Sequence, residues 1–173
     1  LEFTPESRDF IQIRTFSYSD IDRLPGHYLR AQSELSKRYV AALMLEKTAI
    51  DFIYTKGFVG YALLKNKPLI FNNTPIGVKF HGMNMFQKQP NFRGEITKHL
   101  LRPRVRWIMN KSDYVFSYGG KISEIIKKEV KERDKLIELP SAISDDWVRD
   151  VVPEDDLKRI RFLFVGRFDR LKG

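Results

Sequence analysis

Short runs of β-forming residues alternate along this chain with longer segments of helical periodicity. Between His27 and Lys47, for example, apolar side chains recur at the spacing of an amphipathic helix. The runs on either side of such segments are rich in Val, Ile, Phe and Tyr and end at Gly or Pro, which is typical of strands. Strands that alternate with helices of about ten or more residues favour a parallel α/β sheet with right-handed crossovers.

The expected elements follow this alternation along the whole chain. We expect helices over 27–47, 58–64, 91–110 and 121–131, and one helical turn over 155–158. Strands are expected over 10–16, 51–55, 75–80, 113–117, 135–139 and 161–165. Pro103 is expected to break or kink the third helix, because proline removes a backbone donor and clashes with the preceding turn. The order of elements predicts a Rossmann-like parallel sheet flanked by helices.

Composition limits the partners and the chemistry. Lys and Arg number 31 and Asp and Glu 22, so the net charge is +9, which favours an anionic partner such as a nucleotide, a phospholipid or nucleic acid. The absence of Cys excludes disulfides, thiolate zinc sites and Cys nucleophiles. The sequence has no apolar run of about eighteen residues, the length needed to span a membrane. We expect a cytoplasmic protein, either free or peripheral on the cytoplasmic face of the membrane.

Residues just after strands indicate where a ligand would bind, because ligands of open α/β sheets sit beyond the carboxyl ends of the strands. Four of the five strand exits carry glycine, including Gly82. His81 follows a strand and would point into the cleft, where an imidazole can donate to a sugar hydroxyl or a phosphate oxygen. The alternative is a structural histidine bonded to a neighbouring loop. Gly119 and Gly120 could hold an anion at a helix start, or could form only a tight turn.

The stretch at the end of the chain has the composition of a phosphate-binding loop. An apolar run ends at Gly166, and Arg167 and Lys172 follow. Glycine lets the backbone approach a ligand closely, Arg offers a planar donor fork, and Lys adds a mobile point charge. A strand followed by a basic surface turn is the alternative interpretation.

Several common sites are excluded by what the sequence lacks. There is no P-loop motif, no G-x-S-x-G elbow and no G-x-G-x-x-G dinucleotide fingerprint. Three widely separated histidines without Cys give no metal-binding spacing, so we expect no metal and no cofactor.

A basic segment runs from Arg93 to Lys111. It holds six cations and one anion, Glu95, so +5 of the net +9 lies there. Apolar side chains are interleaved with the cations, as in a helix that lies on an anionic membrane surface. A nucleic-acid surface or a solvated helix would have a similar composition. The membrane-surface candidates are Arg102, Arg104, Arg106 and Trp107.

With these elements in order, the chain resembles the amino-terminal domain of a GT-B glycosyltransferase of family 4, a large family of retaining enzymes. The resemblance rests on an Asp-containing strand before Gly57, a strand ending in His81–Gly82, and the segment 110–117 with Asp113 and Ser117. It rests further on 135–143, where Ser141 and Ala142 replace the family's usual Asn-Gly, and on the Gly-Arg and Lys-Gly of 164–173.

The resemblance implies an enzyme that transfers a sugar from a nucleotide-sugar to a glycan or lipid-linked acceptor with retention, without a metal. Arg167 and Lys172, with Gly166, would bind the donor diphosphate and stabilise the leaving group. His81, with Gly82, would contact the donor sugar near the reacting centre. An anionic membrane surface is a further expected partner, and nucleic acid is not.

The resemblance also implies a division of the chain. Residues 1–144 would form an acceptor-side domain that is incomplete at its start, 145–158 an interdomain linker, and 159–173 the first strand and phosphate loop of a donor-binding domain. On this interpretation the chain is a fragment that does not turn over substrate by itself. A GT-B nucleotide-sugar epimerase and a basic α/β module that binds nucleic acid or anionic lipid are the alternatives.

Overall fold

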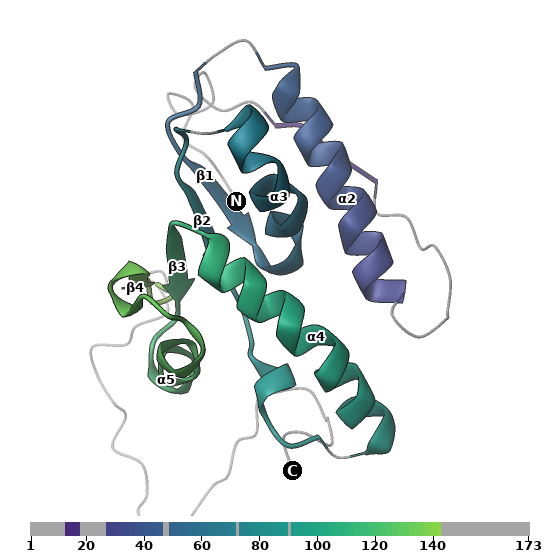
Figure 1. The fold of residues 1–173 in the computed structure, drawn as a ribbon, viewed down its shortest axis with the longest axis vertical. Helices are drawn as coiled ribbons and strands as arrows, with labels where there is room; N and C mark the ends of the chain where they lie inside the picture. Colours follow the sequence, from purple (N-terminus) through teal and green to yellow (C-terminus); the bar gives the residue numbers. More distant parts are fainter. Residues whose placement is uncertain (1–12, 18–26, 47–48, 72, 90, 143–173) are drawn as a thin grey trace, which may run out of the picture.

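The computed structural model has a four-stranded parallel sheet at its centre (Figure 1). It describes residues 13–17, 27–46, 49–71, 73–89 and 91–142. The strands lie in the sheet in chain order: β1 (Ile53–Lys56), β2 (Ile76–Lys79), β3 (Tyr114–Ser117) and β4 (Leu136–Glu138). Neighbouring strands pair in register, with Thr55 opposite Val78 and Val78 opposite Val115. The predicted Rossmann-like α/β fold class is confirmed.

Helices connect the strands. The main helices are α2 (His27–Met44), α3 (Gly60–Ile70), α4 (Phe92–Lys111) and α5 (Gly120–Glu129). Three short 3₁₀ turns join them to the strands: η1 (Gly57–Val59), η2 (Asn84–Phe86) and η3 (Arg133–Lys135). In Figure 1, α2 and α3 lie side by side, and α4 runs from the sheet toward the lower end of the molecule.

The hydrophobic core lies between the helices and one face of the sheet. Along β1 only alternate residues are buried, as expected for a strand with one covered face. The central strand β2 is buried throughout, and Ile76 and Val78 have no exposed surface. Each helix adds apolar side chains to the same core cluster, namely Val40, Leu63, Val105, Ile108, Met109 and Ile126.

The other face of the sheet carries aromatic rings. Phe52, Tyr54 and Phe116 are neighbours there, with Phe52 and Phe116 ring centroids 6.4 Å apart. The rings lie over Gly77 in the centre of the sheet. A Cβ at position 77 would lie 2.8 Å from the Phe52 ring and would also overlap the Phe116 ring, so any other residue there would force these rings to move.

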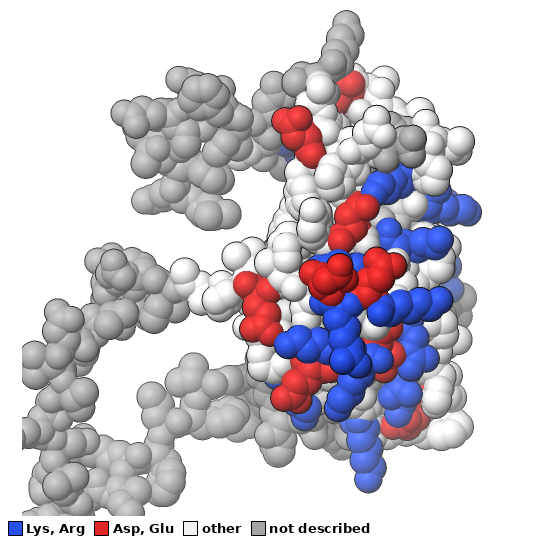
Figure 2. All heavy atoms as spheres, turned by 60° about the vertical axis from the view of Figure 1, so that its left-hand side comes forward, with Lys and Arg blue, Asp and Glu red and all other residues white. Residues whose placement is uncertain are grey.

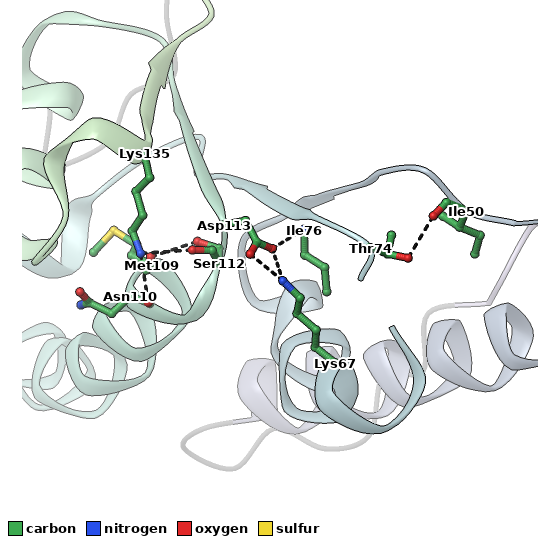
Figure 3. A network of polar contacts seen from close by, with 9 residues as sticks. All are labelled: Ile50, Lys67, Thr74, Ile76, Met109, Asn110, Ser112, Asp113 and Lys135. Atoms are coloured by element: carbon green, nitrogen blue, oxygen red, sulfur yellow. Dashed lines mark hydrogen bonds and ion pairs between the residues drawn. The ribbon is translucent and has the colours of Figure 1, made fainter. Parts of the chain in front are cut away.

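The amino-terminal ends of the strands are joined by a polar network, which Figure 3 shows. Lys67 of α3 donates to both carboxylate oxygens of Asp113, at 2.6 Å to Oδ1, and the Ile76 N–H donates to Asp113 Oδ2 at 2.7 Å. Burial alone would raise the pKa of Asp113, but the hydrogen bonds from Lys67 and Ile76 outweigh it, and the pKa is lowered. Asp113 therefore ties α3 and β2 to the start of β3.

A second lysine closes the end of α4 in the same network. Lys135 Nζ donates to the carbonyls of Asn110 and Ser112 at 3.0 and 3.1 Å. These carbonyls lie where the helix ends, so a cation is favoured beside them. Burial lowers the pKa of Lys135, although nearby Glu132 and Asp113 act in the opposite direction.

Three element predictions need correction. Residues 13–17 form no strand; Phe16 instead packs edge-on against Tyr39 of α2, with ring centroids 4.9 Å apart. The short helix predicted over 58–64 extends to Ile70 through Pro68. Pro103 does not break α4, because buried Val105, Ile108 and Met109 hold the helix on the core. The predicted linker from 145, the helical turn over 155–158 and the strand over 161–165 lie outside the described residues.

Candidate functional site

A cleft of about 720 Å³ opens at the carboxyl ends of β1 and β2. Its walls come from the strand exits, from α2, and from the segment that leads into α4. The parallel order of the strands explains this position, because the carboxyl ends of neighbouring strands meet at one edge of the sheet. The side chains and backbone that line it include Gln32, Lys56, Gly57, Lys79, His81, Gly82, Asn84, Gln89, Arg93, Thr97 and Lys98.

His81 lies in this cleft and is oriented by a residue from the neighbouring strand. Its Nδ1 lies 2.6 Å from the Tyr118 hydroxyl, just beyond β3, and the two rings are 5.4 Å apart. With the Tyr118 O–H as donor, the ring carries its proton on Nε2, which then becomes a donor toward a ligand. The predicted strand-exit position of His81 is confirmed, and its role stays a prediction.

Lys79 places a positive charge at the same edge. The residue is only 6% exposed, although it lies in the last position of β2. Its Nζ donates to the Leu139 carbonyl at 3.0 Å and lies 3.8 Å from the centre of the Tyr118 ring. Among the described residues it has no carboxylate partner. A buried cation without a counter-ion is costly, so an anion bound at this edge would stabilise it.

The loop after β1 is held rigidly against α2. Gly57 has a φ of +50°, which favours glycine, and it lets the chain turn sharply from β1 into η1. Buried Ser36 of α2 donates to the Val59 carbonyl and accepts from the Ala62 N–H at 3.0 Å. These bonds fix one wall of the cleft from within the protein.

The opposite wall is the beginning of α4. Asn91 caps this helix, accepting from the Gly94 N–H at 2.7 Å. Glu95 accepts from the Gln89 N–H at 2.9 Å and pairs with Lys98; the Lys98 hydrogen bond, together with that from Gln89, lowers the pKa of Glu95. The charge of Lys98 is thus paired with a carboxylate, whereas Lys56 and Arg93 have no carboxylate partner among the described residues. The described lining of the cleft thus holds Lys56, Lys79, Arg93 and Lys98 and no Asp or Glu, which favours an anionic ligand.

At the second predicted anion site, the Gly119–Gly120 pair, one backbone donor is already used within the protein. Gly119 and Gly120 have φ of +92° and +57°, as a tight strand-to-helix turn requires. The Gly119 N–H donates to Ser117 Oγ at 3.0 Å, and a Cβ at Gly119 would lie 3.6 Å from the Glu138 carboxylate. This arrangement favours the tight-turn alternative. Gly166, Arg167 and Lys172 lie outside the described residues.

The four membrane-surface candidates on α4 make contacts within the protein. Trp107 packs on Tyr61, with ring centroids 5.0 Å apart, and Arg104 lies over the same Tyr61 ring at 4.3 Å. Arg102 Nε donates to the Met85 carbonyl at 2.6 Å, and Arg106 pairs with Glu129 of α5. Figure 2 shows the face around α5 and β4, where Lys and Arg alternate with Asp and Glu. The predicted membrane contact therefore stays a prediction.

Two residues of the site were missed by the sequence argument. Lys79 lies within the strand expected over 75–80, and a lysine inside an apolar strand before His-Gly is unusual enough to indicate a role. Tyr118 directly precedes the glycine pair Gly119–Gly120, and nothing in the sequence around it indicates a role. Its contact with His81 depends on the lateral alignment of β2 and β3, which sequence spacing does not give.

Within the part of the chain that the structure describes, no cluster of three or more metal-ligating side chains occurs. The helices in that part are also too short or too polar to cross a bilayer. Comparisons with known protein families, with curated proteins and with solved structures found no match to this chain. The geometry of the cleft, together with the sequence resemblance, therefore carries the functional interpretation.

Proposed function

We propose that this chain is the acceptor-side part of a retaining glycosyltransferase that uses a nucleotide-sugar donor. The observation that carries the proposal is that oriented His81 and buried Lys79, which has no carboxylate partner among the described residues, lie at the same carboxyl edge of the sheet. A nucleotide-sugar offers both groups a partner, because it has sugar hydroxyls for an imidazole and diphosphate oxygens for a cation. The resemblance of the chain to family 4 supports the same chemistry.

The roles of the individual groups follow from their positions. The Nε2–H of His81 would donate to a hydroxyl or ring oxygen of the donor sugar near the bond that breaks. The positive potential from Lys79, Lys56 and Arg93 would favour the anionic donor and the charge that develops on the leaving diphosphate. In the intact protein, Arg167 and Lys172 would supply the direct diphosphate contacts, and no metal would be needed.

The experiment that tests the proposal measures sugar transfer by the intact protein from radiolabelled UDP-, GDP- and ADP-sugars to a panel of glycan and lipid-linked acceptors. The His81→Ala variant is expected to lower the transfer rate by about 100-fold or more, the usual contribution of a positioned proton donor. Lys79→Met is expected to weaken donor binding. Lys121→Met, which removes an exposed α5 cation, serves as the matched control and should behave as the unmodified protein.

Three results would contradict the proposal. Absence of any nucleotide-sugar affinity would exclude the donor. Salt-sensitive nucleic-acid binding without such affinity would favour the basic binding module instead. An altered sugar released from the nucleotide-sugar, with no acceptor modified, would favour a GT-B epimerase.

A further inference from the structure

The second face of the sheet is open, and the topology explains why. The four strands lie in chain order, so crossovers of the usual right hand place the connecting helices α3, α4 and α5 on one and the same face. Each of these helices contributes to the core cluster around Val78, through Leu63, Val105 and Ile126. None of the helices that connect the described strands therefore covers the opposite face.

That open face carries a connected group of aromatic rings. Phe52, Tyr54 and Tyr114 are 41%, 45% and 38% exposed. The ring centroids of Phe52 and Tyr114 lie 5.9 Å apart, and those of Tyr54 and Phe116 lie 5.3 Å apart. Phe52 and Phe116 meet over Gly77 of the intervening strand β2. These four residues, Phe52, Tyr54, Tyr114 and Phe116, form the aromatic platform.

The aromatic platform leads to the edge of the cleft. Tyr118 lies two residues beyond Phe116 and so on the same face, and its hydroxyl contacts His81 Nδ1 at 2.6 Å. Burial and, to a lesser extent, the nearby Tyr118 raise the pKa of Tyr54, as expected for neighbouring tyrosine side chains. From Tyr114 to Tyr118 the chain spans about 13 Å, the length of roughly two to three sugar rings.

This face has little charge. The described strand residues that lie on it include no Asp or Glu. Its cations among those residues are Lys56 and Lys79, which are opposite each other in the β1–β2 register, and Lys79 is buried. A nucleic acid would find few partners for its phosphates here. The half-exposed rings suit an uncharged amphipathic ligand that packs an apolar side on them and keeps its hydroxyl groups in water.

We propose that the aromatic platform binds the sugar chain of a glycan acceptor. The C–H groups on one side of each pyranose ring pack on the aromatic rings, while the sugar hydroxyls face solvent. The end of the sugar chain then lies near His81, where the donor sugar would be held. This assignment rests on the proposed transferase function for the nature of the ligand, and it selects an oligosaccharide acceptor over a single sugar.

The test is NMR titration of the isotope-labelled full 173-residue chain with maltohexaose, cellohexaose, chitohexaose and mannohexaose, each compared with its disaccharide. At least one hexasaccharide should shift the ring signals of Phe52, Tyr54 and Tyr114 saturably and bind more tightly than its disaccharide. The double variant Tyr54→Leu, Tyr114→Leu keeps apolar side chains but removes two stacking rings, and should weaken binding by about tenfold or more. Phe92→Leu, which removes an 80% exposed ring on α4, is the matched control and should bind as the unmodified chain does.

A second measurement covers the case in which the double variant does not fold. A spin-labelled form of the hexasaccharide should broaden the ring signals of Tyr54 and Tyr114 in the unmodified chain and leave those of Phe92 sharp. Absence of platform shifts with every hexasaccharide, or binding that the folded double variant retains in full, would overturn the proposal. So would a hexa-uridylate that shifts these signals in place of an oligosaccharide, or a dimer that the double variant dissociates.

Failure of this proposal is distinguishable from failure of the proposed function, because the probes differ. Nucleotide-sugar binding at the cleft without hexasaccharide binding would overturn the role of the aromatic platform alone. Hexasaccharide binding at the platform without any nucleotide-sugar affinity would support the platform and contradict the transferase.

Discussion

At the scale of single residues, one hydroxyl group, that of Tyr118, contacts the imidazole of His81. Tyr118 follows β3, whereas His81 follows β2, and their 2.6 Å contact is the only direct side-chain hydrogen bond that the structure gives between these two exits among the described residues. The Tyr118 ring also lies under the Lys79 ammonium group. Tyr118 therefore orients the imidazole with its hydroxyl and stabilises the buried cation with its ring.

Replacing Tyr118 with Phe separates these two roles. The Phe ring keeps the contact with Lys79, but His81 Nδ1 loses its hydrogen bond, so the imidazole is expected to exchange more freely between its two tautomers. The ¹⁵N chemical shifts of the His81 ring report the tautomer populations directly. The free energy of unfolding should fall by only about 1 kcal/mol. Tyr114→Phe is the matched control, and an unchanged His81 spectrum in Tyr118→Phe would refute the orienting role.

Asp113 makes stability depend on pH. Its pKa is lower in the folded protein than the value of about 3.9 expected for an unfolded chain. The stabilisation it gives is therefore fully present above about pH 5 and is lost as the pH falls through the folded pKa. Asp113→Asn should cost about 1 kcal/mol at neutral pH, a modest value because the carboxylate is partly exposed and screened.

The measurement is urea unfolding of the unmodified chain and of Asp113→Asn between pH 3 and 7. This range extends from below the pKa of an unfolded Asp carboxyl group to neutral pH. The difference in unfolding free energy between them should shrink toward the acid end. A difference that stays constant with pH would show that Asp113 stabilises the fold without its charge. Glu138→Gln, at an exposed pair with Lys127 at 3.8 Å, is the control and should show little difference.

At the scale of elements, the sequence predicted the sheet well and some helices less well. All four described strands begin and end within two residues of their predicted limits, because apolar runs closed by glycine or proline mark buried strands clearly. Residues 13–17 also alternate as a strand would, but they form no strand and Phe16 packs on Tyr39 of α2. The position of His81 at the carboxyl edge of the sheet was predictable from the order of strands and helices. The contacts of Lys79 and Tyr118 were not, because they depend on how neighbouring strands pack side by side.

The continuity of α4 gives an element-scale prediction. Proline inside a helix removes one hydrogen bond, here the bond from position 103 to the His99 carbonyl, and crowds the preceding turn. Pro103 is exposed, so its ring adds little to the core. Pro103→Ala is therefore expected to raise the free energy of unfolding by about 1–3 kcal/mol, measured by urea unfolding. A stability equal to or below that of the unmodified chain would contradict this prediction.

At the scale of the whole molecule, the amino and carboxyl ends of the parallel strands differ in how their polar groups are used. The amino ends are closed by the Lys67–Asp113 and Lys135 contacts, so their polar groups are used within the protein. The carboxyl ends open into the cleft, where Lys79 has no carboxylate partner among the described residues and His81 faces a potential ligand. A cleft at the carboxyl ends is where open parallel sheets bind their ligands.

We propose that an anionic sugar donor binds at this carboxyl edge. The most direct test is NMR titration of the isotope-labelled chain with UDP-glucose, GDP-mannose and ADP-glucose in turn. At least one of them should cause saturable shifts of His81, Gly82 and Arg93, and these shifts should be reduced in Lys79→Met but retained in Lys121→Met. If no nucleotide-sugar moves these signals, or if the shifts map to α5 instead, the account of this cleft is wrong.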